Sequence, residues 1–157
     1  GHSLVKARMR ETGAPFGGEM SGHLFFKDRW YGFDDGLYAG ARLLELASRM
    51  QNITQTLNAL PQSKSTPELQ VQLAEGENHA LVARMQKEAQ WPDASQVITI
   101  DGVRVEYPDG FGLCRASNTT PVLVLRFEAE NDAALARIQR AIGDAITRIK
   151  PNAQLPF

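Results

Sequence analysis

A short polar segment bounded by two prolines, Pro61-Gln-Ser-Lys-Ser-Thr-Pro67, interrupts the chain after its first third. Proline lacks a backbone N–H and restricts the residue before it, so neither a helix nor the interior of a sheet continues through such a segment. Apolar residues follow a different period on its two sides. We therefore predict two units, residues 1–62 and residues 66–157, joined by a linker.

The second unit alternates short strand patterns with two helical patterns. Leu69, Val71 and Leu73 alternate with polar residues, and Asp101-Gly102 suits a two-residue turn between two further strands. The pattern predicts an α+β, two-layer domain with a four-stranded antiparallel sheet and two helices on one face. The strands are expected at 69–73, 97–100, 103–107 and 121–128, and the helices around 81–89 and 135–149.

The first unit is expected to be the end of an α/β domain. Helices are predicted over Leu4–Thr12, stopped by Gly13, and after Asp34-Asp35, either of which can cap the second helix. A short helix near Thr54–Leu60 ends at Pro61.

Composition excludes several classes of function. With 17 Lys and Arg against 18 Asp and Glu, the chain lacks the basic excess that nucleic-acid binding requires. The longest apolar runs, such as Val122–Leu125, are far too short for a bilayer, so no membrane partner is expected. The chain has one cysteine, Cys114, which fits a cytoplasmic location. The histidines and this cysteine show no zinc-like spacing, so no metal site is predicted.

Two polar loops carry the candidate chemistry. The first, residues 17–23, reads Gly-Gly-Glu-Met-Ser-Gly-His; a carboxylate beside a hydroxyl and an imidazole suits a polyhydroxylated ligand. The alternative is a strand-end bulge with a buried histidine. The second, residues 115–121, reads Arg-Ala-Ser-Asn-Thr-Thr-Pro and combines a guanidinium with short donors, as phosphate binding requires. Its alternative is an Asx or Ser/Thr turn beside a surface arginine.

These two motifs, together with Phe-Asp-Asp-Gly at 33–36, resemble the bacterial phosphomannomutase/phosphoglucomutase group of the α-D-phosphohexomutases. The resemblance implies that residues 1–62 are the C-terminal part of the third, sugar-binding domain and that residues 66–157 are the fourth, phosphate-binding domain. Enzymes of this family interconvert hexose 1-phosphate and hexose 6-phosphate, with mannose or glucose as the sugar. They work through a phosphoserine enzyme and a hexose 1,6-bisphosphate intermediate, with Mg²⁺ as cofactor.

The same resemblance assigns roles to eight residues. His23 matches a position credited with ligand contact and proton transfer, and Arg115 matches the anchor of the phosphate that is not transferred. Substrate contacts are implied for His2, Glu19, Ser21, His23, Arg115, Ser117, Asn118 and Thr119.

The phosphoserine loop and the Asp-rich magnesium loop of the family belong to its first two domains, and neither motif occurs in this chain. We therefore expect this polypeptide to be inactive without the missing N-terminal domains, and Mg²⁺ to bind outside it. The start at Gly1-His2, without Met, is expected for an excised piece or a proteolytic remnant. Alternatives are a stand-alone phosphosugar-binding or regulatory module, or a structural interaction domain.

Overall fold

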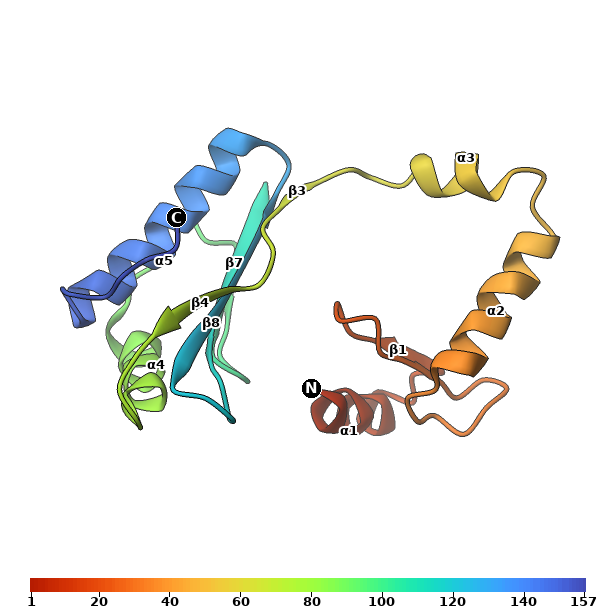
Figure 1. The fold of residues 1–157 in the computed structure, drawn as a ribbon, viewed down its shortest axis with the longest axis horizontal. Helices are drawn as coiled ribbons and strands as arrows, with labels where there is room; N and C mark the ends of the chain where they lie inside the picture. Colours follow the sequence, from red (N-terminus) through yellow and green to blue (C-terminus); the bar gives the residue numbers. More distant parts are fainter. The chain divides into compact units, whose positions relative to one another are not determined.

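The computed structural model describes residues 1–157 and divides into two compact units, Gly1–Leu60 and Pro61–Phe157. Figure 1 shows the elements of each unit along the chain. The first unit contains α1 (His2–Thr12), β1 (Phe16–Gly18), β2 (Leu24–Phe26), α2 (Gly36–Ser48) and α3 (Ile53–Asn58). The second contains β3 (Lys64–Ser65), β4 (Leu69–Gln72), α4 (Glu77–Glu88), β5 (Gln96–Ile98), β6 (Val103–Tyr107), β7 (Gly110–Ala116), β8 (Val122–Ala129) and α5 (Asp132–Ile149).

The first unit is built around a β-hairpin in which β1 pairs antiparallel with β2. Of the two aspartates predicted as caps, Asp35 caps α2, because its carboxylate accepts the backbone N–H of Tyr38 at 2.9 Å. Only Met9 and Phe25 are buried in this unit, whereas Leu37 and Leu44 on α2 are 90% and 71% exposed. The unit therefore buries little apolar surface of its own.

The second unit is a single antiparallel sheet covered on one face by α4 and α5 (Figure 1). Its strand order is β3-β8-β7-β6-β5, and β4 also pairs with β8. The core lies between the sheet and the two helices, where Met85 of α4 meets Ile138, Ile142 and Ile146 of α5 over buried strand residues. The predicted two-layer α+β fold with both helices on one face is confirmed.

The predicted count of four strands is wrong, because the sheet also contains β3 and β7. Strand β7 lies in the middle of the sheet, between β6 and β8. Its sequence was difficult to identify as a strand because glycines at 110 and 112 lower β propensity. Gly112 is required by packing instead: a Cβ at this position would lie 2.9 Å from Ile142 Cγ1 and 3.0 Å from Ile138 Cγ2.

The predicted two-residue turn at Asp101-Gly102 is also wrong. Ile98 pairs with Arg104, so residues 99–103 lie between the paired positions. Gly102 has a φ of 95°, and a Cβ there would be 2.4 Å from the carbonyl oxygen of Cys114, so glycine serves a close backbone approach. The two-residue connection is instead Pro108-Asp109, since Tyr107 pairs with Gly110.

None of the helices combines the length and the apolar character that crossing a bilayer would take.

Replacing Gly112 with Val tests the packing of α5 on β7. Strand propensity alone favours Val, but the added methyl groups would collide with Ile138 and Ile142. We expect Gly112→Val to lower the free energy of unfolding by about 1–3 kcal/mol in urea titrations followed by circular dichroism. Leu113→Val, on the opposite face of the same strand, is the control and should cost less. A Gly112→Val chain at least as stable as the wild type would contradict this packing.

Candidate functional site

The first polar loop is the tip of the β1–β2 hairpin. Gly18 pairs with Leu24, and the backbone N–H of Glu19 donates to the carbonyl of His23 at 2.9 Å. The N–H of Gly22 then donates to the carbonyl of Glu19 at 3.0 Å, and Gly22 adopts a φ of 86°. The turn therefore needs glycine at this position and presents its side chains from a defined backbone.

Ser21 and His23 lie together in this loop, as both were predicted to serve one site. Ser21 Oγ is 2.6 Å from His23 Nδ1, and His23 Nε2 is 3.8 Å from Asp34 Oδ2. Asp34 is held there by an antiparallel bridge to Phe25 of β2. The His23 side chain is 51% exposed, which excludes the alternative of a buried histidine.

Asp34 is a candidate site residue that the sequence analysis missed. The Asp-Asp pair was interpreted only as a helix cap, but Asp35 alone caps α2. The sequence contains one indication of this role: a single aspartate is enough to cap a helix, so the second of the pair can serve another purpose. The resulting row of hydroxyl, imidazole and carboxylate can accept or donate hydrogen bonds to a ligand and can hold or move a proton at His23.

Glu19 and His2 are near the start of α1. The Gly1 nitrogen lies 3.8 Å from Glu19 Oε2, which brings the first turn of this helix next to the loop. The Glu19 side chain is mostly buried, with 19% of its surface exposed. His2 is exposed, and its contact is Ser3 Oγ at 3.5 Å from Nδ1, so nothing in the structure joins it to Ser21 or His23.

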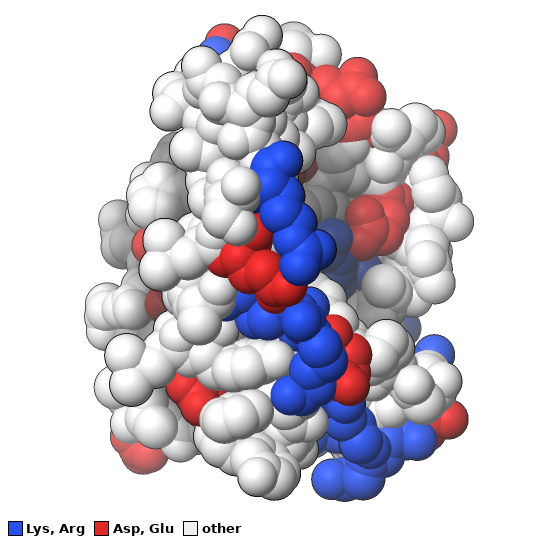
Figure 2. Space-filling model, turned by 90° about the vertical axis from the view of Figure 1, so that its right-hand side faces the viewer, with Lys and Arg blue, Asp and Glu red and all other residues white.

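The segment that carries Asp34 is tied to α2 by ion pairs. Arg42 Nη1 is 2.9 Å from Asp28 Oδ1, and the Arg29 and Arg49 guanidinium groups both contact Glu45. The hydrogen bond from Arg42 lowers the pKa of Asp28, and the one from Arg29 lowers the pKa of Glu45. Figure 2 shows basic and acidic side chains alternating in a stripe on one face. These pairs are exposed, so they orient the segment more than they stabilise it.

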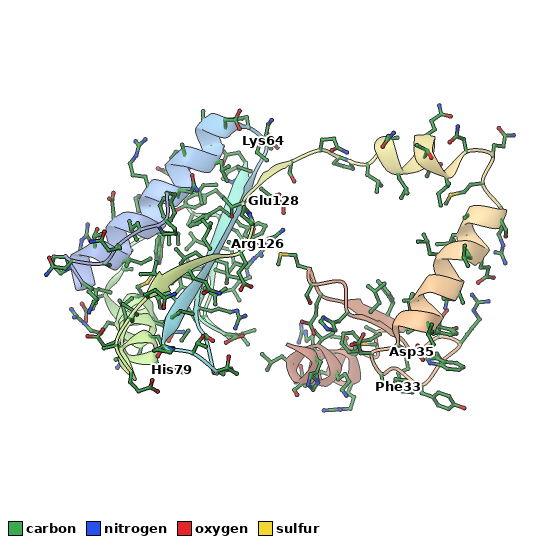
Figure 3. The ribbon with its side chains drawn as sticks, in the orientation of Figure 1. Phe33, Asp35, Lys64, His79, Arg126 and Glu128 are labelled. Atoms are coloured by element: carbon green, nitrogen blue, oxygen red, sulfur yellow. The ribbon has the colours of Figure 1, made fainter.

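Aromatic packing holds the same segment. The Trp30 ring stacks on Tyr38 with centroids 4.5 Å apart, and its indole N–H donates to Asp35 at 3.1 Å. Trp30 therefore packs against the start of α2. Phe33 lies beside Asp35 (Figure 3) and stacks on Tyr31, and both rings are exposed.

The second polar loop follows β7 in the other unit. Arg115 lies one residue before the end of β7, pairs through its backbone with Val124, and has no hydrogen-bond or ion-pair partner for its guanidinium. The loop itself begins at Ser117, because Arg115 and Ala116 belong to the strand. An unpaired guanidinium at a strand end is available for an anion.

Ser117 organises the loop. Its Oγ accepts the backbone N–H groups of Thr119 and Thr120, each at 3.3 Å, and lies 3.0 Å from Thr120 Oγ1. This is the Ser/Thr turn that the sequence offered as an alternative, and it directs amide groups toward one oxygen. Asn118 and Thr119 are exposed, and Asn118 forms no hydrogen bond within the chain. A phosphate oxygen can compete with Ser117 Oγ for the hydrogen bonds that the Thr119 and Thr120 N–H groups donate.

No group of three or more His, Cys, Asp and Glu side chains is placed to hold a metal ion. His79 lies in the first turn of α4 (Figure 3) and is exposed. Cys114 is completely buried, and burial raises the pKa of its thiol to about 12.

Comparison with known proteins places both units. Residues 1–63 match the family model "Phosphoglucomutase/phosphomannomutase, alpha/beta/alpha domain III", and residues 68–145 match "Phosphoglucomutase/phosphomannomutase, C-terminal domain". The chain belongs to the phosphoglucomutase/phosphomannomutase family. The predicted resemblance is thus confirmed, and the loops at 17–23 and 115–121 each lie inside one of the matched segments.

Relatives in this family match the whole chain. It is 57% identical to a phosphoglucomutase from Neisseria meningitidis and 49% identical to a phosphomannomutase/phosphoglucomutase from Pseudomonas aeruginosa; 100% of this chain and 34% of each relative are covered. A crystal structure of a family protein from Burkholderia thailandensis matches with a TM-score of 0.90 and 62% identity, over 100% of this chain and 33% of that one. The chain spans about a third of the length of these relatives.

The buried thiol makes a testable prediction. In the folded chain Cys114 should stay protonated and react with a thiol reagent at pH 8 orders of magnitude more slowly than in urea, because the thiolate is the reactive form. Unfolding lets the thiol ionise near its usual pKa of 9, so its contribution to stability is complete below pH 9 and is lost as the pH rises toward about 12.

The measurement is the free energy of unfolding of the wild type and of Cys114→Val between pH 8 and 10. Their difference should change by roughly 1 kcal/mol per pH unit above pH 9, to the disadvantage of the wild type. A constant difference, or rapid native labelling, would show that this thiol is accessible.

Proposed function

We propose that this chain is the C-terminal, ligand-binding part of a phosphohexomutase that interconverts hexose 1-phosphate and hexose 6-phosphate, with mannose or glucose as the sugar. The observation that carries the proposal is the unpaired Arg115 guanidinium next to a loop whose amides converge on one oxygen atom. Membership of the family and names of the relatives support this reading.

In this proposal the second unit, residues 66–157, holds the phosphate that is not transferred. Arg115 offers a planar fork that fits two phosphate oxygens, and Ser117, Asn118 and Thr119 add hydroxyl and amide donors. A mutase must accept one sugar phosphate in two orientations, and such a donor set recognises the dianion without contacting the sugar. The same site therefore serves both orientations.

Residues 1–62 provide the sugar contacts. Glu19 and Ser21 bind sugar hydroxyls, His2 lies near the ligand, and His23 contacts it and takes part in proton transfer. The Ser21 hydroxyl, 2.6 Å from Nδ1, and the Asp34 carboxylate, 3.8 Å from Nε2, support that role because they lie on either side of the imidazole and can orient it. The exposed Leu37 and Leu44 on α2 are compatible with the remainder of an α/β/α domain covering them.

The remaining chemistry belongs to N-terminal domains that we propose as partners. They supply the phosphoserine and the loop for Mg²⁺, which would stabilise charge on the phosphoryl group in transfer, and the hexose 1,6-bisphosphate intermediate forms there. The residues of this chain do not fit a metal, since no cluster of potential ligands is present. The chain alone is therefore inactive in this proposal, and the complete enzyme works in the cytoplasm.

The central test is the affinity for phosphate of Arg115→Lys. Lysine keeps the charge but loses the bidentate geometry, so we expect binding of inorganic phosphate to weaken about tenfold. Amide chemical shifts of residues 117–120 in a phosphate titration at constant ionic strength measure it. Arg104→Lys is the matched control, because Arg104 stacks on Phe111 in the same sheet and pairs with Glu106. Equal affinities of wild type and Arg115→Lys would overturn the assignment.

A second prediction concerns the sugar loop in the full-length mutase. Glu19→Ala and Ser21→Ala should each raise KM for hexose phosphate and lower turnover by about tenfold, since each removes a hydrogen bond to a sugar hydroxyl. Steady-state kinetics measure both constants, and circular dichroism checks the fold. Ser48→Ala, which removes a hydroxyl that donates to a carbonyl in α2, should leave the kinetics unchanged. Wild-type kinetics in both loop variants would refute the sugar role.

A further inference from the structure

Asn78, on the second residue of α4, is the one buried polar side chain in the chain, with 3% of its surface exposed. A buried amide is costly unless it forms hydrogen bonds, so its partners explain why it is there. Its Nδ2 donates to the carbonyl oxygens of Ser117 at 2.9 Å, Thr120 at 3.3 Å and Val122 at 3.4 Å. All three belong to the second polar loop or to the strand residue that follows it.

No other side chain outside the loop bonds to it. The remaining hydrogen bonds are those of Ser117 Oγ, the backbone bonds Ser117 N–Val122 O at 3.0 Å and Val122 N–Thr120 O at 2.8 Å, and one backbone bond from Leu73 to Pro121. Asn78 is therefore the only side chain of the helix layer that forms hydrogen bonds with this loop.

The contact with Ser117 determines where one particular donor points. In a trans peptide the C=O and the following N–H point in opposite directions. The Ser117 carbonyl points at Asn78 inside the protein, so the N–H of Asn118 points away from it. That N–H has no acceptor within the chain. Asn78 thus keeps an unpaired amide directed outward, close in sequence to the amides of Thr119 and Thr120 that converge on Ser117 Oγ.

We infer that Asn78 is a positioning residue for anion binding: it holds the 117–118 peptide so that the Asn118 N–H, with the neighbouring amides, is ready to receive a phosphate oxygen. The inference rests on the proposed function, since it names the residue that prepares the same loop. Asn78 lies behind the loop and does not touch the ligand. Its effect is to lower the cost of ordering the loop when the anion binds.

The experiment compares four variants of the 157-residue chain in titrations with inorganic phosphate at constant ionic strength, read from the amide signals of residues 117–120. Asn78→Leu keeps nearly the same volume and removes the donor. Asn78→Gln keeps a donating amide on a longer stem. Asn131→Ala is the matched control, because Asn131 caps α5 through Ala134 N, beyond the far end of β8, and its loss also costs stability. Arg115→Lys reports on the anion site itself.

We expect Asn78→Leu to weaken phosphate binding about threefold to tenfold and to speed hydrogen exchange of the Thr119 and Thr120 amides. Asn78→Gln should recover part of the affinity, and Asn131→Ala should bind like the wild type. If Arg115→Lys weakens binding while Asn78→Leu behaves like Asn131→Ala, the inference is overturned and the proposed function stands. If the wild-type loop does not respond to phosphate, both are overturned together.

Discussion

The approach of α5 to the middle strand of the sheet at Gly112 is the contact on which the second unit depends. Ile138 and Ile142 lie where a side chain at position 112 would be, so helix and strand come as close as their backbones allow. Packing this tight has two consequences: Ile138, Ile142 and Ile146 of α5 are fully buried, and β7 cannot shift in register without a collision. The positions of Arg115, at the end of β7, and of the loop that begins at Ser117 depend on this contact.

What lies at that end is the proposed phosphate site. Arg115 pairs with Val124 of β8, and Gly102 packs against its backbone so closely that no Cβ would fit. Beyond the strand, the loop rests on Asn78 of α4. The polar groups are thus oriented by backbone and buried contacts, while the Arg115 guanidinium and the Asn118 N–H have no partner within the chain and the amides of Thr119 and Thr120 donate to Ser117 Oγ. Such preorganisation favours binding of an anion, because few groups have to be ordered when it arrives.

In the first unit two adjacent aspartates have different roles, one structural and one in the candidate site. Asp35 caps α2 and accepts the Trp30 indole, whereas Asp34 faces His23. The residue that begins α2 and the residue that faces His23 are therefore neighbours in the chain. The ion pairs Arg29–Glu45 and Arg42–Asp28 connect the segment before them to α2. The exposed leucines of α2 show that this unit alone does not bury its apolar surface.

Much of this organisation could be predicted from local pattern. The apolar period of α5, the alternation at Leu69–Leu73 and the cap at Asp35 depend on neighbours in the chain, and each is present in the structure. The middle strand could not be predicted in this way. Its glycines lower the strand propensity locally, and Gly112 is required by the packing of Ile138 and Ile142, more than twenty residues further along the chain. The two-residue turn at Asp101-Gly102 could not be predicted for the same reason. Strands β5 and β6 do pair as a hairpin, but the connection is longer, and Gly102 is required by its close approach to the carbonyl oxygen of Cys114.

The sequence by itself determined the fold class, the two polar loops and the family, because each depends on short-range periodicity or on a contiguous motif. Only the tertiary structure decided that Cys114 is completely buried, that Asp34 faces His23 and that Asn78 donates hydrogen bonds to the loop at 117–122. A motif specifies which groups are available. Their direction and their ionisation depend on burial and on partners distant in sequence, and these exist only once the helices have packed on the sheet.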